Sequence, residues 1–151
     1  MQYYHADVFC KEPMTGNGLT VFIAKAFPQS AVMQRIAREF RQFETIFLVR
    51  RGDAAFDARI FTVEEELDFA GHPVLGAAAA VQHEFLQEAS STVLFNLNSK
   101  QVSAFCTSSH FRISQNTMAV KRVIMTAVWI RGQRNSSVRQ SRKNTRTICG
   151  R

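Results

Sequence analysis

The C-terminal third of the chain lacks acidic residues altogether. Residues 1–99 contain 8 basic and 12 acidic side chains, whereas residues 100–151 contain 11 basic side chains and no acidic one. The formal net charge of +7 therefore comes entirely from the C-terminal segment. Acidic residues make up about one eighth of average sequence. A segment of this length without any acidic residue therefore differs in composition from the rest of the chain. We divide the chain into 1–106 and an atypical basic tail, 107–151.

Cysteine is also scarce. Cys10, Cys106 and Cys149 are widely spaced and odd in number, which fits neither a disulfide framework nor the spacing of metal ligands. The histidines have no ligand-spaced partners either, so we expect no metal site. Cys10 and Cys106 fall on apolar strand faces, and we interpret them as buried structural thiols rather than as an acid–base pair.

Long hydrophobic runs are absent as well. No stretch approaches the length of a membrane span, and the N-terminus lacks the charged and then apolar build of a signal peptide. Together with the few cysteines, this favours a cytoplasmic protein that does not enter a membrane.

The hydrophobic pattern of residues 1–106 predicts an α+β fold with mostly antiparallel strands, one helix outside and one central. The first helix is expected to be capped by Ser30 and to end near Gln42, and the second to run from Pro73 to Gln87. The expected strands cover residues 3–10, 19–24, 44–49, 56–62, 92–97 and 102–106. In the first strand, Asp7 is expected to face away from the buried side.

Beyond residue 106 the pattern fades. Residues 120–130 hold one more apolar run, which fits a strand or a short helix. Residues 132–151 are rich in Arg, Ser, Asn and Thr, and we expect them to remain unfolded because little apolar surface offsets the loss of chain entropy. The basic charge leaves binding to nucleic acid open, but no aromatic interleaving suggests base stacking, so we do not expect that partner.

The segment EEELDFAGHPVLGAAAA, residues 64–80, is the most informative in the chain. Gly71 is expected to adopt a backbone conformation closed to other residues, and Pro73 suits the first position of a helix. The free amides at that helix start, beside His72, would bind an anion such as a substrate carboxylate. The run of alanines that follows suits a helix buried inside other structure. The alternative is an ordinary strand–turn–helix connection with a solvated histidine and a solvated glutamate patch.

Glu44 is the strongest catalytic candidate. It opens a strand in which Ile46 and Leu48 share its face, so its carboxyl group should point toward the apolar side. Burial would raise its pKa and suit it to proton transfer near neutral pH. The alternative is a strand-end carboxylate that returns to water. Asn17, between two glycines, could present its amide to a ligand or equally form an ordinary turn.

Taken together, these residues resemble the phenazine-biosynthesis PhzF-like family of isomerases. Order and spacing agree over about the first hundred residues, and two departures are visible: Gly18 replaces a usual proline, and Phe43 replaces a common serine before Glu44. The matching pieces are YYHADVF, TGNGLTVFIA, MQRIAREFRQFETIFLV and RIFTVEEELDFAGHPVLGAAAAV.

The resemblance implies a fold like that of diaminopimelate epimerase, in which two lobes each wrap strands around a central helix and the active site lies between them. It implies that Glu44 is the general acid–base and that His72, Gly71 and Asn17 line the substrate site. Enzymes of this family isomerise small carboxylate-bearing metabolites, such as a dihydro-hydroxyanthranilate, by moving a proton without a cofactor or a metal.

The resemblance also implies a second lobe, which supplies an aspartate and a glycine-rich anion loop. Residues 107–151 match neither feature, so we interpret them as sequence foreign to the family, as after a frameshift or in a truncated gene. A homodimer is expected to rebuild part of the cleft. The alternatives are an inactive or partner-binding remnant lobe and, less favoured, a nucleic-acid-binding protein that uses the basic tail.

Overall fold

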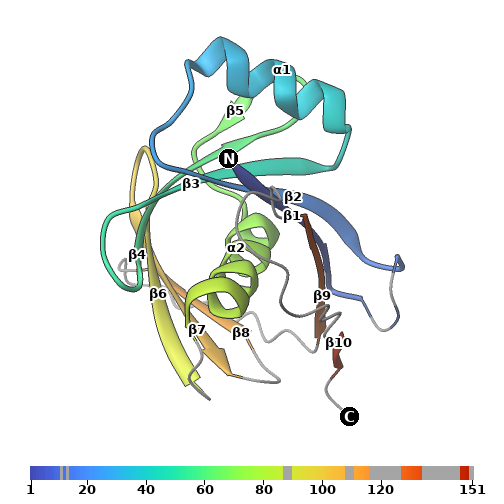
Figure 1. Cartoon of the computed structure of the whole chain (residues 1–151), viewed down its shortest axis with the longest axis vertical. Helices are drawn as coiled ribbons and strands as arrows, with labels where there is room; N and C mark the ends of the chain where they lie inside the picture. The colour runs from blue at the N-terminus through green and yellow to red at the C-terminus, as the bar shows by residue number, and fades with distance from the viewer. Residues whose placement is uncertain are drawn as a thin grey trace.

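A single mixed sheet wraps around the helix α2, and a second helix, α1, lies on the outside of the sheet (Figure 1). The structure is a computed structural model that describes residues 1–10, 12, 14–86, 90–107, 111–115, 127–133 and 147–149, the last three ranges by their backbone. The helices are α1, Ser30–Phe40, and α2, Gly71–Phe85. The strands are β1 Gln2–Val8, β2 Asn17–Ala24, β3 Glu44–Arg50, β4 Ala55–Phe61, β5 Glu66–Leu67, β6 Ser90–Asn96, β7 Gln101–Thr107, β8 Phe111–Gln115, β9 Ala127–Gln133 and β10 Thr147–Cys149.

The strand order is β10-β9-β1-β2-β3-β4-β6-β7-β8, with β5 paired to β4. Neighbouring strands are antiparallel except for two parallel pairs, β2 with β3 and β4 with β6. The connection between β2 and β3 contains α1, and the connection between β4 and β6 contains β5 and α2. Each parallel pair thus contains a helical crossover, as parallel pairing requires.

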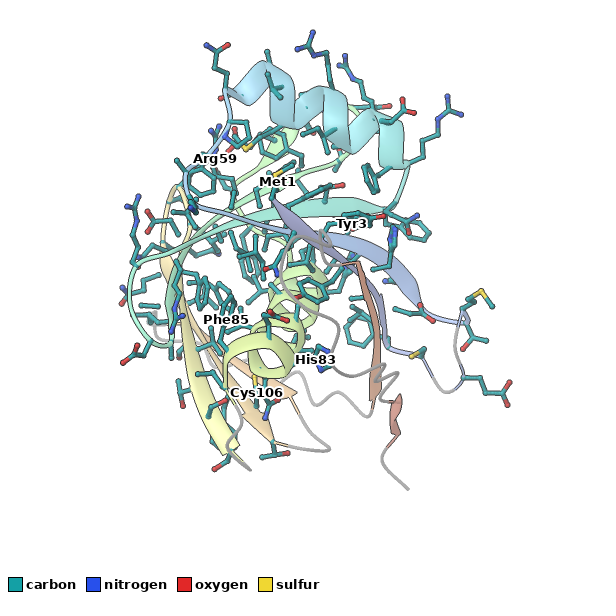
Figure 2. All side chains as sticks on the ribbon, viewed as in Figure 1. Met1, Tyr3, Arg59, His83, Phe85 and Cys106 are labelled. Atoms are coloured by element: carbon teal, nitrogen blue, oxygen red, sulfur yellow. The ribbon has the colours of Figure 1, made fainter. Side chains whose placement is uncertain are left out.

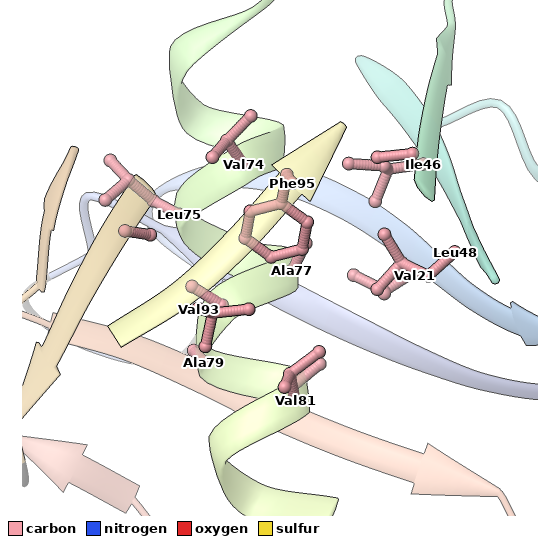
Figure 3. Packing of buried hydrophobic residues seen from close by; sticks show 14 of the residues in the cluster. Val21, Ile46, Leu48, Val74, Leu75, Ala77, Ala79, Val81, Val93 and Phe95 are labelled. Atoms are coloured by element: carbon pink, nitrogen blue, oxygen red, sulfur yellow. The ribbon is translucent and has the colours of Figure 1, made fainter. Parts of the chain in front are cut away.

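The main core lies between α2 and the concave side of the sheet (Figure 3). The strand side chains Val21, Ile46, Leu48 and Phe95 are all fully or almost fully buried against the helix. The small side chains of α2 allow strands to approach it from several sides, and Ala77 to Ala80 have no exposed surface. At Gly76 an added Cβ atom would lie 2.5 Å from Cδ2 of Leu19, so only glycine fits there without a shift.

The second core lies between α1 and the convex side of the sheet. Phe22, Phe47 and Phe61 point to this side, and Phe22 and Phe47 stack with ring centroids 5.0 Å apart. Met33 and Ala37 of α1 are buried against them. Figure 2 shows Tyr3 on the same side, whereas His83 and Phe85 lie at the C-terminal end of α2.

These observations confirm the α+β prediction, with one helix central and one outside, and the hairpin of β6 and β7. The capping prediction was wrong. Gln29 is the N-cap residue of α1, no side chain caps it, and the Ser30 hydroxyl instead accepts a hydrogen bond from Arg59. The helix ends at Phe40 because Arg41 adopts a left-handed conformation, with φ of 50°.

The prediction of an unfolded segment over residues 132–151 was wrong for the described part of that range. Strand β9 includes Gly132 and Gln133, and residues 147–149 form β10. The apolar run at 120–130 ends in β9, which pairs with β1. These backbones bond to a preformed sheet edge, a source of stability that local composition does not reveal. The rest of the range lies outside the described residues. No helix in the described part of the chain is long and apolar enough to cross a membrane.

Candidate active site

Glu44 is the first residue of β3, and its side chain points to the α2 side of the sheet. Ile46 and Leu48, two and four residues further along, lie in the core around α2, as the alternation of a strand requires. In the parallel pairing of β2 with β3, Glu44 lies beside Leu19. The prediction that Glu44 faces the apolar interior is therefore confirmed.

The start of α2 carries His72 as its second residue. The N-cap residue, Ala70, is extended, and no side chain in the described part of the protein caps the first amides of the helix. Two details of the predicted turn were wrong. Gly71 does not have a positive φ and an added Cβ would meet no atom within 4 Å, so its backbone is open to other residues. Pro73 is the third helical residue rather than the first.

The carboxyl group of Glu44 and the imidazole of His72 face each other. The Glu44 Oε2 and His72 Nε2 atoms lie 2.8 Å apart, and their side chains are 17% and 12% exposed, respectively. The two atoms approach closely without hydrogen-bond geometry, and neither has a hydrogen-bond partner among the described residues. Two titratable groups from distant parts of the sequence therefore face each other in a partly buried location.

Burial pushes both members of this pair toward their uncharged forms. It raises the pKa of Glu44 above the ordinary 4.5 and lowers the pKa of His72 below the ordinary 6.5. The two shifts bring the proton affinities of the groups closer together, which lowers the cost of passing a proton between them. An acid and a base with matched affinities are suited to general acid–base chemistry.

Asn17 lies at the same end of the sheet as Glu44. It is the first residue of β2 and is exposed. Because side chains two residues apart share a face, Asn17 lies on the α2 side with Leu19, the neighbour of Glu44. The structure thus brings Glu44 and His72 into contact and places Asn17 on the adjoining strand, with Gly71 next to His72 at the helix start. It shows no contact of Asn17 with the pair.

The sequence analysis missed the role of Asp7. This residue was expected to face away from the buried side, yet the residue is only 7% exposed. Its two oxygens accept hydrogen bonds of 3.0 Å from the backbone N–H groups of Thr15 and Gly16, so Asp7 fastens the loop between β1 and β2. The signal was an aspartate at a strand end followed by a loop containing Thr-Gly, since short acidic side chains accept from nearby loop amides.

Other candidate groups take no part in this site. Cys10 and Cys106 are both buried, as predicted, and burial raises the pKa of Cys106 to about 12. Within the described ranges, no cluster of three or more His, Cys, Asp or Glu side chains could hold a metal ion.

Comparison with known proteins shows which family the chain belongs to. The family described as phenazine biosynthesis-like protein, PhzC-PhzF, matches residues 6–146. A trans-2,3-dihydro-3-hydroxyanthranilate isomerase from Pseudomonas chlororaphis is 41% identical over 104 residues, which cover 63% of this chain and 37% of the relative. The enzyme of the same name from Pseudomonas fluorescens is 37% identical over 115 residues, which cover 70% of this chain and 41% of the relative. The chain thus spans about two fifths of the length of these relatives.

Solved structures agree. A predicted epimerase from Pseudomonas aeruginosa superposes with a TM-score of 0.67 at 45% identity, covering 74% of this chain and 41% of that one. A PhzF-family protein from Enterococcus faecalis gives a TM-score of 0.66 at 32% identity, covering 74% and 42%. A probable proline racemase from Agrobacterium radiobacter, 12% identical with a TM-score of 0.59, shares the fold alone. The chain belongs to the phenazine biosynthesis-like, or PhzC-PhzF, family of proteins.

Proposed function

We propose that this chain provides the proton-transferring lobe of an isomerase that acts on a small carboxylate-bearing metabolite, with Glu44 as the general acid–base. The observation that carries the proposal is the buried contact of 2.8 Å between Glu44 and His72. The relatives named as trans-2,3-dihydro-3-hydroxyanthranilate isomerases support the reaction class.

The chemistry of the pair fits a proton shift within one substrate. A buried carboxyl group of raised pKa can take a proton from one carbon and return it to another without a metal. His72, kept neutral by burial, lies close enough to exchange a proton with the Glu44 carboxyl group after a small change of side-chain orientation. Glu44 is therefore the proton carrier. His72 anchors the substrate or positions the Glu44 carboxyl group that removes the proton.

The carboxylate of the substrate would bind at the start of α2. The helix dipole and uncapped amides there favour an anion, and no acidic side chain occupies the first turn. Asn17, exposed on the neighbouring strand, offers an amide to the polar groups of the substrate. Gly71 leaves open space beside these groups, since an added Cβ would meet no atom within 4 Å.

The test is the transfer of deuterium from solvent into trans-2,3-dihydro-3-hydroxyanthranilate. The purified chain is incubated with this compound in D2O, and incorporation at carbon is followed by NMR. Glu44→Gln should abolish incorporation, with a loss of at least a hundredfold, because a neutral amide cannot carry the proton. The matched control is Glu39→Gln, since Glu39 is an exposed carboxylate on α1. Equal incorporation by wild type and Glu44→Gln would refute the role of Glu44, and no incorporation by folded wild-type chain would refute activity of the chain alone.

We further propose that the chain acts as a homodimer in which a second copy covers the mouth of the site. Phe43, directly before Glu44, is 69% exposed, and Phe9 and Met14 in the β1–β2 loop are 47% and 87% exposed. Exposed apolar side chains favour a covering surface, and Phe43 adjoins Glu44 in the sequence. Analytical ultracentrifugation should show a dimer that Phe43→Ser weakens, and a monomer at all concentrations would refute the proposal.

A further inference from the structure

The loop between β1 and β2 is held by one buried side chain at its base. Asp7 accepts from the amide of Thr15 at Oδ2 and from the amide of Gly16 at Oδ1, each at 3.0 Å, and its side chain is almost fully buried. Hydrogen bonds to a charged acceptor that is shielded from water are the stronger kind. The strand end and the far end of the loop are therefore tied together through two adjacent amides.

The loop packs closely at this tie. A Cβ atom added to Gly16 would lie closest to the carbonyl oxygen of Val8, and it would lie 2.8 Å from Oδ1 of Asp7 and 2.9 Å from the backbone nitrogen of Cys10. The Cys10 thiol in turn donates to the carbonyl oxygen of Asp7, at 3.2 Å. Contacts from both ends of the loop thus converge on Asp7, and Gly16 leaves the backbone room to reach the carboxylate.

Asn17 follows directly after the two tied amides. It opens β2 and pairs in register with Val8, the residue after Asp7. Any shift of residues 15 and 16 therefore shifts Asn17 relative to Glu44, which lies on the next strand beside Leu19. The two amides that Asp7 holds thus directly precede Asn17, whereas no contact between Asp7 and the Glu44–His72 pair is found among the described residues.

We propose that Asp7 is a positioning residue for substrate binding, which fixes the start of β2 so that Asn17 presents its amide beside Glu44. This inference rests on the proposed function, because it needs Asn17 to bind substrate. It assigns Asp7 a part in binding rather than in proton transfer.

The first test is steady-state kinetics with trans-2,3-dihydro-3-hydroxyanthranilate. Asp7→Asn keeps the shape but turns one acceptor into a donor that faces a backbone N–H group. KM should rise on the order of tenfold while kcat stays within about twofold, because the binding wall moves and the proton carrier does not. Asp53→Asn, at an exposed carboxylate, is the matched control and should leave both constants unchanged. A fall in kcat at unchanged KM overturns the proposal.

A double-mutant cycle separates positioning from general damage. Asn17→Ala removes the amide that Asp7 is proposed to place, so Asp7→Asn should raise KM by less than about twofold in that background. An equal rise in both backgrounds would show that Asp7 does not act through Asn17. If Asp7→Asn does not fold, Asp7→Glu keeps the charge but displaces the carboxylate from the two amides, and it should reproduce the KM effect.

Amide hydrogen exchange tests the tie without any substrate. The Thr15 and Gly16 amides should exchange on the order of tenfold faster in Asp7→Asn than in wild type. Unchanged exchange overturns the tie, whatever the activity. A wild-type chain that neither binds nor isomerises the compound refutes the proposed function, and the positioning role with it, even where the exchange result shows the tie to be present.

Discussion

The Glu44 carboxyl group lies 2.8 Å from the His72 imidazole, and burial shifts the pKa of each group toward its uncharged form. The pair joins the first residue of β3 to the first turn of α2. Its electrostatic state is therefore coupled to the stability of the lobe as well as to its chemistry.

Glu44 and His72 should make contributions of opposite sign to the pH dependence of the free energy of unfolding. The raised pKa of Glu44 gives a contribution that is complete below pH 4.5 and is lost as pH rises through the folded-state pKa. The lowered pKa of His72 gives one that is complete above pH 6.5 and is lost as pH falls through the folded-state pKa. Between pH 4.5 and 6.5, the free energy of unfolding of Glu44→Gln, taken relative to wild type, should therefore rise with pH. That of His72→Gln, also taken relative to wild type, should fall with pH. Urea denaturation across this range measures both, and slopes of the same sign would contradict the expectation.

Gly76 should tolerate no side chain, whereas Gly71 should. Ala at position 76 would place its Cβ 2.5 Å from Cδ2 of Leu19 and 3.0 Å from Cγ2 of Val8, so buried side chains must shift. We expect Gly76→Ala to lower the free energy of unfolding by about 1–3 kcal/mol, even after the gain in helix propensity. Gly71→Ala, with no atom within 4 Å of its Cβ, should leave stability the same or raise it slightly. Chemical denaturation of both variants decides the matter, and an equal effect would show that the packing at Gly76 is loose.

Glu66 should stabilise the lobe in a pH-dependent way. Both of its carboxylate oxygens accept from Arg59, and Asn98 donates to one of them. The hydrogen bond from Arg59 is the main reason that the pKa of Glu66 lies below its ordinary 4.5. Its contribution is therefore present above pH 4.5 and is lost as pH falls through the lowered pKa. Glu66→Gln should lose about 1 kcal/mol at pH 7 and less at pH 3.

The control for Glu66 is its neighbour Glu64, which is exposed. Glu64→Gln should change the free energy of unfolding by less than about 0.5 kcal/mol at either pH. Equal losses in the two variants would indicate a general effect of removing negative charge rather than the contact with Arg59.

Cys106 should be inert in the folded chain. Its side chain is completely buried, and burial raises its pKa to about 12 from an ordinary 9.0. At pH 8 this lowers the thiolate fraction roughly a thousandfold, besides blocking access. Peptide mass spectrometry after treatment with iodoacetamide should find Cys106 unlabelled in native protein and labelled in urea. Labelling of Cys106 in the native chain would instead support the alternative that this thiol is reactive and takes part in catalysis.

Sequence periodicity predicted the elements that carry the site because their apolar patterns are strong. The alternation that placed Glu44 with Ile46 and Leu48 is a local property, and it holds in the structure. The contact of Glu44 with His72 was not predicted from pattern, since it depends on how far α2 slides along β3. The packing of Gly76 against Leu19 and Val8 likewise joins segments that are distant in the sequence, and no local window reveals it.

The errors share one physical cause. Asp7 was assigned from the alternation of its strand and Gly71 from the preference of its residue type, whereas the surroundings of each position depend on partners elsewhere. Asp7 is buried because two loop amides reach it, and Gly71 keeps an ordinary backbone because the turn before α2 is extended at Ala70. The strands at 127–133 and 147–149 exist for a similar reason, since a sheet edge supplies their hydrogen bonds.

The strand order shows that residues from the segment without acidic side chains form both ends of the sheet. The strands at both ends of the sheet, β8 on one side and β10 with β9 on the other, come from residues beyond 107, and they lie against β7 and β1. Truncation after residue 107 would expose the unpaired backbone edges of both β1 and β7. Exposed strand edges pair with other molecules, so the truncated chain should aggregate. A chain shortened to remove its positive charge should therefore lose solubility before it reveals anything about what the charge binds.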